Sequence, residues 1–302
     1  MNILGDVYYE EVFYHITMDC NLRCKHCYAG DHLIKGQHGD SNKIINEITH
    51  FRELGTKKIV LLGGEPTIHP GFVNIFTKTL ELGFSQVIVD TNGQIDFPIP
   101  RYPYSCLKTR FSFEGSDAQT NDQIRGIGAF YKSISNLKKL IARGINCEIT
   151  CTINRYNFRK LPEFIEYFAS IGIQNFNFHF LSITGTAKYN QHLILNPEEI
   201  LEVQALLQTI SNSKKYVIIF PKLLVREDEI LTEQNKGLKC LIGSNKRVLV
   251  FNDGRRLFCP LELSQQKTTH GKISKICVCP YEELLFPQGL PSNYKMTCIS
   301  WK

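Results

Sequence analysis

Residues 17–30 read TMDCNLRCKHCYAG, and this stretch places three cysteines, Cys20, Cys24 and Cys27, within eight positions of the chain. It directly follows a short β-type run, VFYHIT, at residues 12–17. In sheets built from parallel strands, the loops after the strands carry the functional side chains. The three thiols are therefore expected at the carboxyl end of the first strand of such a sheet.

The spacing of these thiols indicates a metal centre. Soft thiolates at this density bind iron–sulfur clusters or zinc. A structural zinc site takes four ligands, and His26 or His32 is the candidate for the missing one. A cubane cluster on three cysteines instead leaves one iron open to bind a further group. The spacing favours the cluster over zinc, and both over a purely structural loop.

The sequence from residue 12 to about residue 181 alternates β-type runs with segments of helical period, which predicts βα units and a parallel sheet. The six runs are VFYHIT, KKIVLL, QVIVDT, KTRFSF, NCEITCTI and NFNFHF. Helical segments such as NKIINEITHFRELG and AFYKSISNLKKLIARG lie between them, each ending in Gly. Six units do not close an eight-stranded barrel. We therefore expect the α/β class and a partial (β/α)6 TIM-like barrel. A small C-terminal iron–sulfur cluster domain is added by the resemblance of the tail that is given below.

Three regions follow from the change in composition along the chain. Residues 1–195 form the expected barrel core. Residues 196–237 begin with NPEEILEVQALLQTI, a helix with Asn196 as its cap, and continue as a mixed linker. Residues 238–302 contain five cysteines and only short β-type runs such as RVLVF. A segment this small and rich in turns gains stability from a bound metal.

Composition excludes several classes of protein. The chain has 302 residues, 43% of them hydrophobic, and no run of about 18 uncharged apolar residues that would span a membrane. The first residues, MNILGDVYYEEVFY, include acidic side chains and show no export signal, so the eleven cysteines indicate a reducing compartment, and we expect a cytoplasmic protein. The formal charge of +6 is dispersed, which argues against nucleic acid and is compatible with an acidic electron donor.

The three-cysteine spacing, with the aromatic Tyr28 after the last thiol, resembles the radical S-adenosylmethionine (radical SAM) superfamily. The resemblance covers roughly residues 12–187. It implies a 4Fe-4S cluster on Cys20, Cys24 and Cys27, whose open iron binds the methionine amine and carboxylate of S-adenosylmethionine. One electron then cleaves this cofactor and releases a 5′-deoxyadenosyl radical, which abstracts a hydrogen atom from the substrate. The cofactor supplies the reactivity, and the protein supplies ligation and orientation.

Three further stretches stand where motifs of this superfamily are expected. LLGGEPTIHP resembles the motif that holds the methionyl ammonium, because a carboxylate beside two glycines suits a bound ammonium group. The strand end VDTNG offers Thr91 and Asn92 at the mouth of the sheet. In FSFEG, Ser112 and Glu114 match positions that usually touch the cofactor's ribose or the substrate. The resemblance assigns cofactor binding to Tyr28, Gly63, Gly64, Glu65, Pro66, Thr91, Asn92, Ser112 and Thr150.

No catalytic residue is assigned firmly, and the candidates are Glu114 and His179. Glu114 is the fourth residue of FSFEG. The alternation of NFNFHF puts Asn177 and His179 opposite three Phe residues, so His179 points into the barrel if the Phe face meets the helices. A hydrogen-bonded core histidine is the alternative interpretation. The same alternation in INCEITCTIN predicts that Cys147 and Cys151 are buried structural thiols.

One position departs from the superfamily pattern. Relatives often carry Arg just after the Gly of the sixth loop, where it meets the cofactor carboxylate, whereas SITGTAKYN has Thr186 there. Lys188 or a backbone amide is the expected substitute.

The tail resembles the cluster-binding extension that is called SPASM in its long form and twitch in its short form. A Gly precedes Cys259 by five positions, as at the start of that extension. The long form holds two clusters, whereas five cysteines suffice for one auxiliary 4Fe-4S cluster. The expected ligands are Cys240 and Cys259, completed by two of Cys277, Cys279 and Cys298. Zinc in this tail is the alternative.

We therefore expect an enzyme that modifies an unactivated C–H bond. The first hypothesis is maturation of a ribosomally made precursor peptide (a RiPP) by crosslinking or epimerisation, which the run FSFEGSDAQTNDQIRG and the extension favour. Against it, too few residues precede the first strand for a leader-binding domain at that end. The second hypothesis is a twitch-type dehydrogenase, an oxidoreductase whose auxiliary cluster accepts the second electron from a small molecule. The third is a non-catalytic iron–sulfur or zinc module.

The expected partners follow from these hypotheses. They are the peptide or small-molecule substrate and an acidic electron donor such as flavodoxin or ferredoxin, with no nucleic acid and no membrane.

Overall fold

The computed structural model describes residues 7–99, 105–229, 246–260 and 285–301, together with 262 and 283. Its centre is a ten-stranded sheet in the order β10-β7-β6-β5-β4-β3-β2-β1-β8-β9. The strands are β1 Glu11–Thr17, β2 Lys58–Gly63, β3 Gln86–Thr91, β4 Leu107–Ser112, β5 Asn146–Ile153, β6 Asn175–Phe180, β7 Val217–Arg226, β8 Arg247–Phe251, β9 Arg256–Leu257 and β10 Tyr294–Trp301.

From β7 across to β8 all neighbouring strands are parallel, and only β9 and β10 pair antiparallel, at the two ends of the sheet. The two ends do not pair with each other, so the sheet is open. The predicted partial barrel is therefore confirmed.

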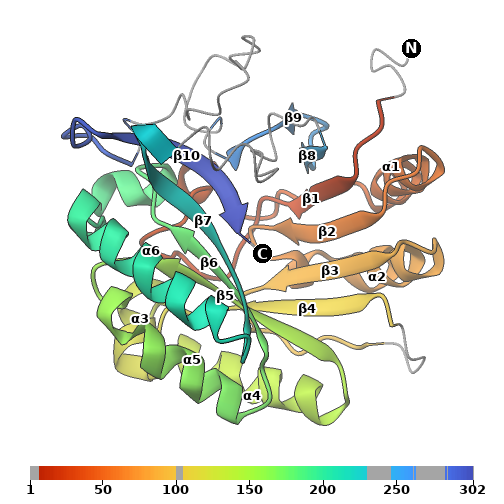
Figure 1. The fold of residues 1–302 in the computed structure, drawn as a ribbon. Coiled ribbons are helices and arrows are strands. Elements are labelled where there is room, and N and C mark those ends of the chain that lie inside the picture. Colours follow the sequence, from red (N-terminus) through yellow and green to blue (C-terminus); the bar gives the residue numbers. More distant parts are fainter. Residues whose placement is uncertain are drawn as a thin grey trace.

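Helices cover the outer face of the curved sheet (Figure 1). Side-chain caps fix the starts of several of them, since Asp40, Asp117 and Asn196 each accept a hydrogen bond from a backbone N–H of the first turn. The predicted cap at Asn196 is thus confirmed. The helices are α1 Ser41–Glu53, α2 Phe72–Glu81, α3 Ala118–Arg125, α4 Ala129–Ala142, α5 Leu161–Ser170 and α6 Pro197–Asn212, with short 3-10 turns η1 Gly30–His32, η2 Pro66–Ile68, η3 Phe158–Lys160, η4 Gly185–Tyr189, η5 Gln191–Leu193 and η6 Glu227–Glu229.

The main core lies between the sheet and these helices. The outward residues of β5 and β6 belong to it, including Cys147 at 6% exposure, Cys151 at 1%, and the buried rings of Phe176 and Phe178. The two thiols are therefore buried as predicted. The residues that alternate with them project to the inner face of the sheet, the face turned away from the helices.

Four of the ten strands, β7 to β10, were not predicted as members of the sheet. β7 lies in the segment expected to be a linker, and its pairing with β6 ends at Ile219, two residues before Pro221. Beyond that point β7 pairs with β10 instead. β8, from the tail, adds to β1 in parallel. The sequence of β7 is a weak signal for a central strand, because Pro221 lacks the backbone N–H that such a strand donates.

None of the helices in the described part of the chain has the length and apolar character needed to cross a membrane.

Candidate active site

The cysteine loop leaves the carboxyl end of β1, as the sequence predicts. Cys24 is buried, and Cys20 and Cys27 are partly exposed. Burial raises the pKa of the Cys20 thiol to about 11 and that of Cys27 to about 12, and the neighbouring thiols add to both increases. The three sulfurs therefore lie close enough to interact, and binding iron requires that they lose their protons.

Among the described residues, no three His, Cys, Asp or Glu side chains are grouped as one metal ion requires. In a cubane each thiolate binds its own iron, so the sulfurs stand further apart. His26, one candidate for a fourth zinc ligand, instead places its Nε2 2.9 Å from Oε1 of Glu114.

The glycine pair after β2 packs directly on the start of the cysteine loop. A Cβ at Gly63 would collide with the carbonyl oxygen of Thr17, and one at Gly64 with that of Asp19. The backbone N–H groups of Gly64 and Glu65 donate to these same two oxygens, at 2.9 Å each. The absence of a side chain thus lets the segment that carries Glu65 lie against the loop that carries the thiols.

Glu65 is 1% exposed and accepts hydrogen bonds from the ends of two elements. Its Oε1 accepts from the hydroxyls of Thr67 (2.6 Å) and Thr91 (2.8 Å) and from the Thr67 N–H (3.2 Å). Its Oε2 accepts from the backbone N–H of Asn92 at 2.7 Å. Burial raises the pKa of Glu65, and these donors oppose the increase. The structure thus brings together Glu65, Thr91 and Asn92, and Pro66 begins η2 beside them.

The side chain of Asn92 connects β3 to the cysteine loop. Its Nδ2 donates to Oδ1 of Asn21 at 2.7 Å and lies 3.8 Å from Sγ of Cys20. Its Oδ1 accepts from the backbone N–H of Gln94. Asn92 therefore holds the loop beside the first thiol.

The other polar residues of the predicted site line the inner face of β4 to β6. Ser112 pairs in register with Thr150, and Thr150 with Asn177; Ser112 and Thr150 are both half-buried. His179 is exposed, and the alternation of β6 puts it on the inner face of the sheet, opposite Phe178 and Phe180. Its role, as a substrate contact or as a hydrogen-bonded core histidine, stays a prediction.

Glu114, the other catalytic candidate, is part of a buried ion network. Its carboxylate contacts Nε and Nη2 of Arg125 and Nε2 of His26, and its side chain is 1% exposed. Although burial alone would raise the pKa of Glu114, Arg125 and His26 outweigh it and lower the pKa to about 2. Glu114 therefore has no proton to donate at neutral pH, and its contacts favour a role in holding the cysteine loop.

The sixth loop fastens the same cysteine loop from the other side. The Thr186 hydroxyl donates to the carbonyl oxygen of Cys24 at 2.7 Å, and its N–H donates to that of Cys27 at 3.0 Å. A Cβ at Gly185 would collide with the Cys27 carbonyl oxygen. Lys188, the expected substitute for the missing Arg, pairs with Asp31 at 2.8 Å.

Tyr28 connects the loop to the tail strand. Its hydroxyl lies 2.7 Å from Nε2 of His15 in β1, and the His15 ring stacks on Phe251 of β8 at 4.2 Å between centroids. Burial raises the pKa of Tyr28 and lowers that of His15 to about 4, so both groups are neutral at pH 7. β8 therefore supports the loop next to its third cysteine.

Two residues that support the cysteine loop were not given that role from the sequence. Arg125 stands within the quoted run FSFEGSDAQTNDQIRG without a role, and its charge acts on the Cys24 thiol. Thr186 was noted only because it replaces an Arg. In both cases the signal is a polar residue next to a Gly at the end of a βα unit, which is too common to identify a contact.

Of the tail cysteines, Cys259 is 4% exposed and belongs to the main core. Cys298 lies in β10, where the structure describes the backbone alone. Cys240, Cys277 and Cys279 lie outside the described residues. The auxiliary cluster stays a prediction.

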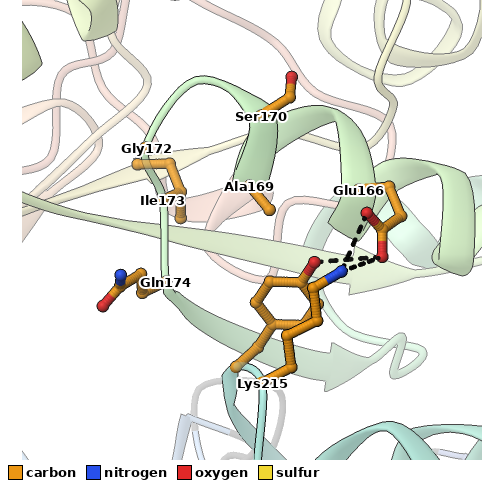
Figure 2. Close-up of a pocket in the computed structure, with 8 residues that line it drawn as sticks. Glu166, Ala169, Ser170, Gly172, Ile173, Gln174 and Lys215 are labelled. Carbon is orange, nitrogen blue, oxygen red and sulfur yellow. Dashed lines mark hydrogen bonds and ion pairs between the residues drawn. The ribbon is translucent and has the colours of Figure 1, made fainter.

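A separate surface pocket lies at the opposite edge of the sheet, before β6 and β7. Figure 2 shows Lys215 reaching Glu166, with their charged atoms 3.1 Å apart. The Tyr216 hydroxyl donates to the same carboxylate. The pocket is lined by Glu166, Ala169, Ser170, Gly172, Ile173, Gln174, Lys215 and Tyr216. Its charged groups pair with each other, which leaves the cysteine loop as the better site.

Comparison with known proteins places this geometry in a family. The sequence pattern of the Radical SAM superfamily matches residues 14–168, half of the chain. The AdoMet-dependent heme synthase of Nitratidesulfovibrio vulgaris is 27% identical over 199 residues, which are 64% of this chain and 53% of that protein. The mycofactocin maturase MftC of Mycobacterium ulcerans is 25% identical over 154 residues, 49% of this chain and 41% of that protein. The chain spans about half the length of the curated relatives it matches.

Solved structures agree on the fold. Streptococcus suis SuiB bound to its precursor peptide SuiA gives a TM-score of 0.68 at 13% identity, covering 92% of this chain and 65% of that chain. Native anSMEcpe with bound AdoMet gives 0.60 at 16% identity, covering 82% and 74%. The partial barrel and the sequence match lead to one conclusion: this chain belongs to the radical SAM superfamily, whose members are enzymes.

Proposed function

We propose that the protein binds a 4Fe-4S cluster on Cys20, Cys24 and Cys27, cleaves S-adenosylmethionine reductively and modifies an unactivated C–H bond. The observation that carries this proposal is the contact of the Glu65 segment with the cysteine loop. Because the Glu65 N–H donates to the Asp19 carbonyl oxygen, the carboxylate lies beside the residues that hold the thiols.

The residues present fit the cofactor pair. Three thiols, with no fourth ligand beside them among the described residues, would leave one iron for the methionyl group, and Glu65 is the candidate partner for its ammonium. Oε1 of Glu65 accepts three hydrogen bonds and Oε2 accepts one, so Oε2 has the greater capacity for another donor. When bound, the cluster and S-adenosylmethionine supply the one-electron chemistry that removes a hydrogen atom from carbon.

The chain itself positions this chemistry. Thr186 fixes the carbonyls of Cys24 and Cys27. Ser112 and Thr150 pair in register and, by the alternation of their strands, lie on the inner face of the sheet, where they are candidates to contact the cofactor. Rigid support of this kind keeps reacting groups within the short range that radical transfer needs.

We infer a ribosomally made precursor peptide as the substrate. The fold of SuiB, solved with its precursor peptide SuiA, covers 92% of this chain, and MftC is named a maturase. A small-molecule substrate is the second candidate. It is favoured by the match to the AdoMet-dependent heme synthase and by a 24% identical match, over 209 residues, to the probable GTP 3′,8-cyclase of Saccharolobus solfataricus.

The proposal also includes an electron acceptor in the tail and an external electron donor. An auxiliary 4Fe-4S cluster in the tail, with Cys259 among its ligands, would accept an electron in a dehydrogenation. An acidic flavodoxin or ferredoxin would deliver the electron that starts each turnover, consistent with the net charge of +6.

Electron paramagnetic resonance of the reduced, anaerobically reconstituted protein tests the proposal. Adding S-adenosylmethionine should change the spectrum of the cluster on the three-cysteine loop, because its open iron gains a ligand. The matched control replaces Cys20, Cys24 and Cys27 by Ala, and its remaining signal should not respond. A wild-type spectrum that is unchanged at saturating cofactor refutes cofactor binding at this loop.

A further inference from the structure

Asn92, the residue that follows β3, has a hydrogen-bond partner for each of its polar atoms. Its backbone N–H donates to Oε2 of Glu65 at 2.7 Å, and its carbonyl oxygen accepts from the Ser133 hydroxyl at 2.6 Å. Its Oδ1 accepts from the backbone N–H of Gln94 at 2.9 Å. The residue is 7% exposed. Its place and the orientation of its carboxamide are therefore fixed from several sides.

Helix α4 holds the loop on which Asn92 lies. Nε2 of Gln94 donates to the Ser133 hydroxyl at 2.6 Å, and Nδ2 of Asn136 donates to the carbonyl oxygen of Gly93 at 2.9 Å. These three polar side chains are all buried. Gly93 has a φ of +74°, which a residue with a side chain rarely adopts. The buried bonds and this fixed turn leave Asn92 little freedom to move.

The Nδ2 group of Asn92 faces the cysteine loop. It donates to Oδ1 of Asn21 at 2.7 Å and to Sγ of Cys20 at 3.8 Å. A carboxamide nitrogen carries two hydrogens, so both bonds form at once. Because Oδ1 accepts from the Gln94 N–H, the nitrogen and not the oxygen of the carboxamide is turned to the sulfur.

The sulfur of Cys20 has a second donor of a different kind. The backbone N–H of Leu22 lies 3.4 Å from it. This donor belongs to the cysteine loop itself, and any residue other than Pro would supply it. The donor from Asn92 comes from a side chain on another element, so it depends on the residue type at position 92.

A hydrogen bond to a cluster sulfur acts on the redox balance of the cluster. A ligating sulfur carries negative charge, and this charge grows when the cluster takes up an electron. The N–H therefore stabilises the reduced state more than the oxidised state, which raises the reduction potential.

We propose that Asn92 is a positioning residue that acts through Cys20, and that its N–H···S hydrogen bond raises the reduction potential of the cluster on the cysteine loop. This inference rests on the proposed function. It adds to that function the residue that helps the cluster to accept the electron with which the reaction starts.

A redox titration followed by electron paramagnetic resonance tests this role. The protein is full-length and anaerobically reconstituted, without S-adenosylmethionine. The signal to follow is the one that is lost when Cys20, Cys24 and Cys27 are replaced by Ala, which separates this cluster from any cluster in the tail.

Two substitutions remove the donor. Asn92→Leu keeps the approximate volume of the side chain, and Asn92→Ala removes the same N–H group with less bulk. Both should make the midpoint potential more negative. At a fixed solution potential the ratio of reduced to oxidised cluster should fall about tenfold, which is about 59 mV for a one-electron couple.

The matched control is Asn21→Ala. It removes the other partner of Nδ2, and with it a bond between the cysteine loop and the end of β3, but it leaves the donor to the Cys20 sulfur. Its potential should equal that of wild type. If Asn92 only supported the loop, Asn21→Ala would shift the potential as the Asn92 variants do. Iron and labile sulfide analysis measures the loading of each protein.

The possible results separate this proposal from the proposed function. A wild-type potential in loaded Asn92→Leu and Asn92→Ala proteins, or an equal shift in Asn21→Ala, overturns the role of Asn92 and leaves the proposed function in place. Failure of both Asn92 variants to bind iron and sulfide also overturns it, because Asn92 is then a support of the loop. A wild-type protein with no signal that depends on the three cysteines refutes the proposed function and this role together.

Discussion

Replacing Glu114 by Gln tests whether the buried ion network supports the cysteine loop. Gln keeps the volume of the side chain and removes its charge, which leaves the guanidinium of Arg125 buried without its counter-ion. The contact of Glu114 with His26, which stands between two of the three cysteines, is weakened at the same time. The substitution therefore acts on the loop without touching a thiol.

Two separate arguments give the expected loss of stability of the Glu114→Gln protein. The pKa of Glu114 falls from its ordinary value of 4.5 to about 2, and at about 1.4 kcal/mol for each pKa unit this corresponds to about 3 kcal/mol of stability at pH 7. Removing one member of a buried ion pair typically costs about 3–5 kcal/mol. We expect Glu114→Gln to lower the free energy of unfolding by about 3 kcal/mol.

The pH dependence has a defined sign. Because the folded-state pKa is lowered, the contribution of Glu114 is fully present above about pH 4.5 and is lost as the pH falls toward 2. Wild type and variant should therefore converge in acid. Urea unfolding followed by circular dichroism measures the difference, at pH 7 on reconstituted protein and through the acid range on the metal-free, reduced chain.

The matched control is Glu166→Gln, at an exposed carboxylate that also pairs with one cation, Lys215. It should leave the urea midpoint within experimental error. A loss below about 1 kcal/mol for Glu114→Gln at pH 7, or a difference that does not shrink in acid, refutes the reasoning.

Three further substitutions test single contacts. Glu65→Gln should weaken S-adenosylmethionine binding tenfold or more with iron content unchanged, since a charge-assisted hydrogen bond contributes about 1.5–3 kcal/mol; equal affinity in equilibrium dialysis would make Glu65 structural. Gly64→Ala should lower iron and labile sulfide content, because its Cβ meets the Asp19 carbonyl oxygen and lies 2.9 Å from Cβ of Cys20; full loading argues against this close packing. Thr186→Val keeps the shape and loses the hydroxyl bond to Cys24, so urea unfolding should show a loss of about 1 kcal/mol, and no change would mean that the bond is dispensable.

The sheet and its first six strands were predictable because their signal is periodic. Alternation in β5 and β6 assigns Cys147 and Phe176 to the core, and the structure buries both. β7 was missed because Pro221 and Lys222 interrupt its apolar run, and its place is decided by pairing with β10 near the end of the chain. Long-range pairing of this kind leaves no local pattern.

In the candidate site, too, the short-range patterns were predictable and the long-range contacts were not. The cysteine spacing and the Gly63–Glu65 segment are short-range patterns, and the structure brings them into contact as expected. The supports were not predictable, because they act between residues far apart in the sequence. Arg125 binds Glu114, which contacts His26, 88 positions before it, and Thr186 contacts Cys24, 162 positions before it. Their residue types are common on loops, and only their place in the fold gives them a role.

Cleavage of the cofactor tests the central claim most directly. Reconstituted protein reduced with dithionite and given S-adenosylmethionine should form 5′-deoxyadenosine and methionine in amounts that exceed the protein, and the variant with Cys20, Cys24 and Cys27 replaced by Ala should form neither. If a wild-type protein that contains iron and sulfide on this loop forms no 5′-deoxyadenosine under these conditions, the assignment of reductive S-adenosylmethionine cleavage to this loop is contradicted.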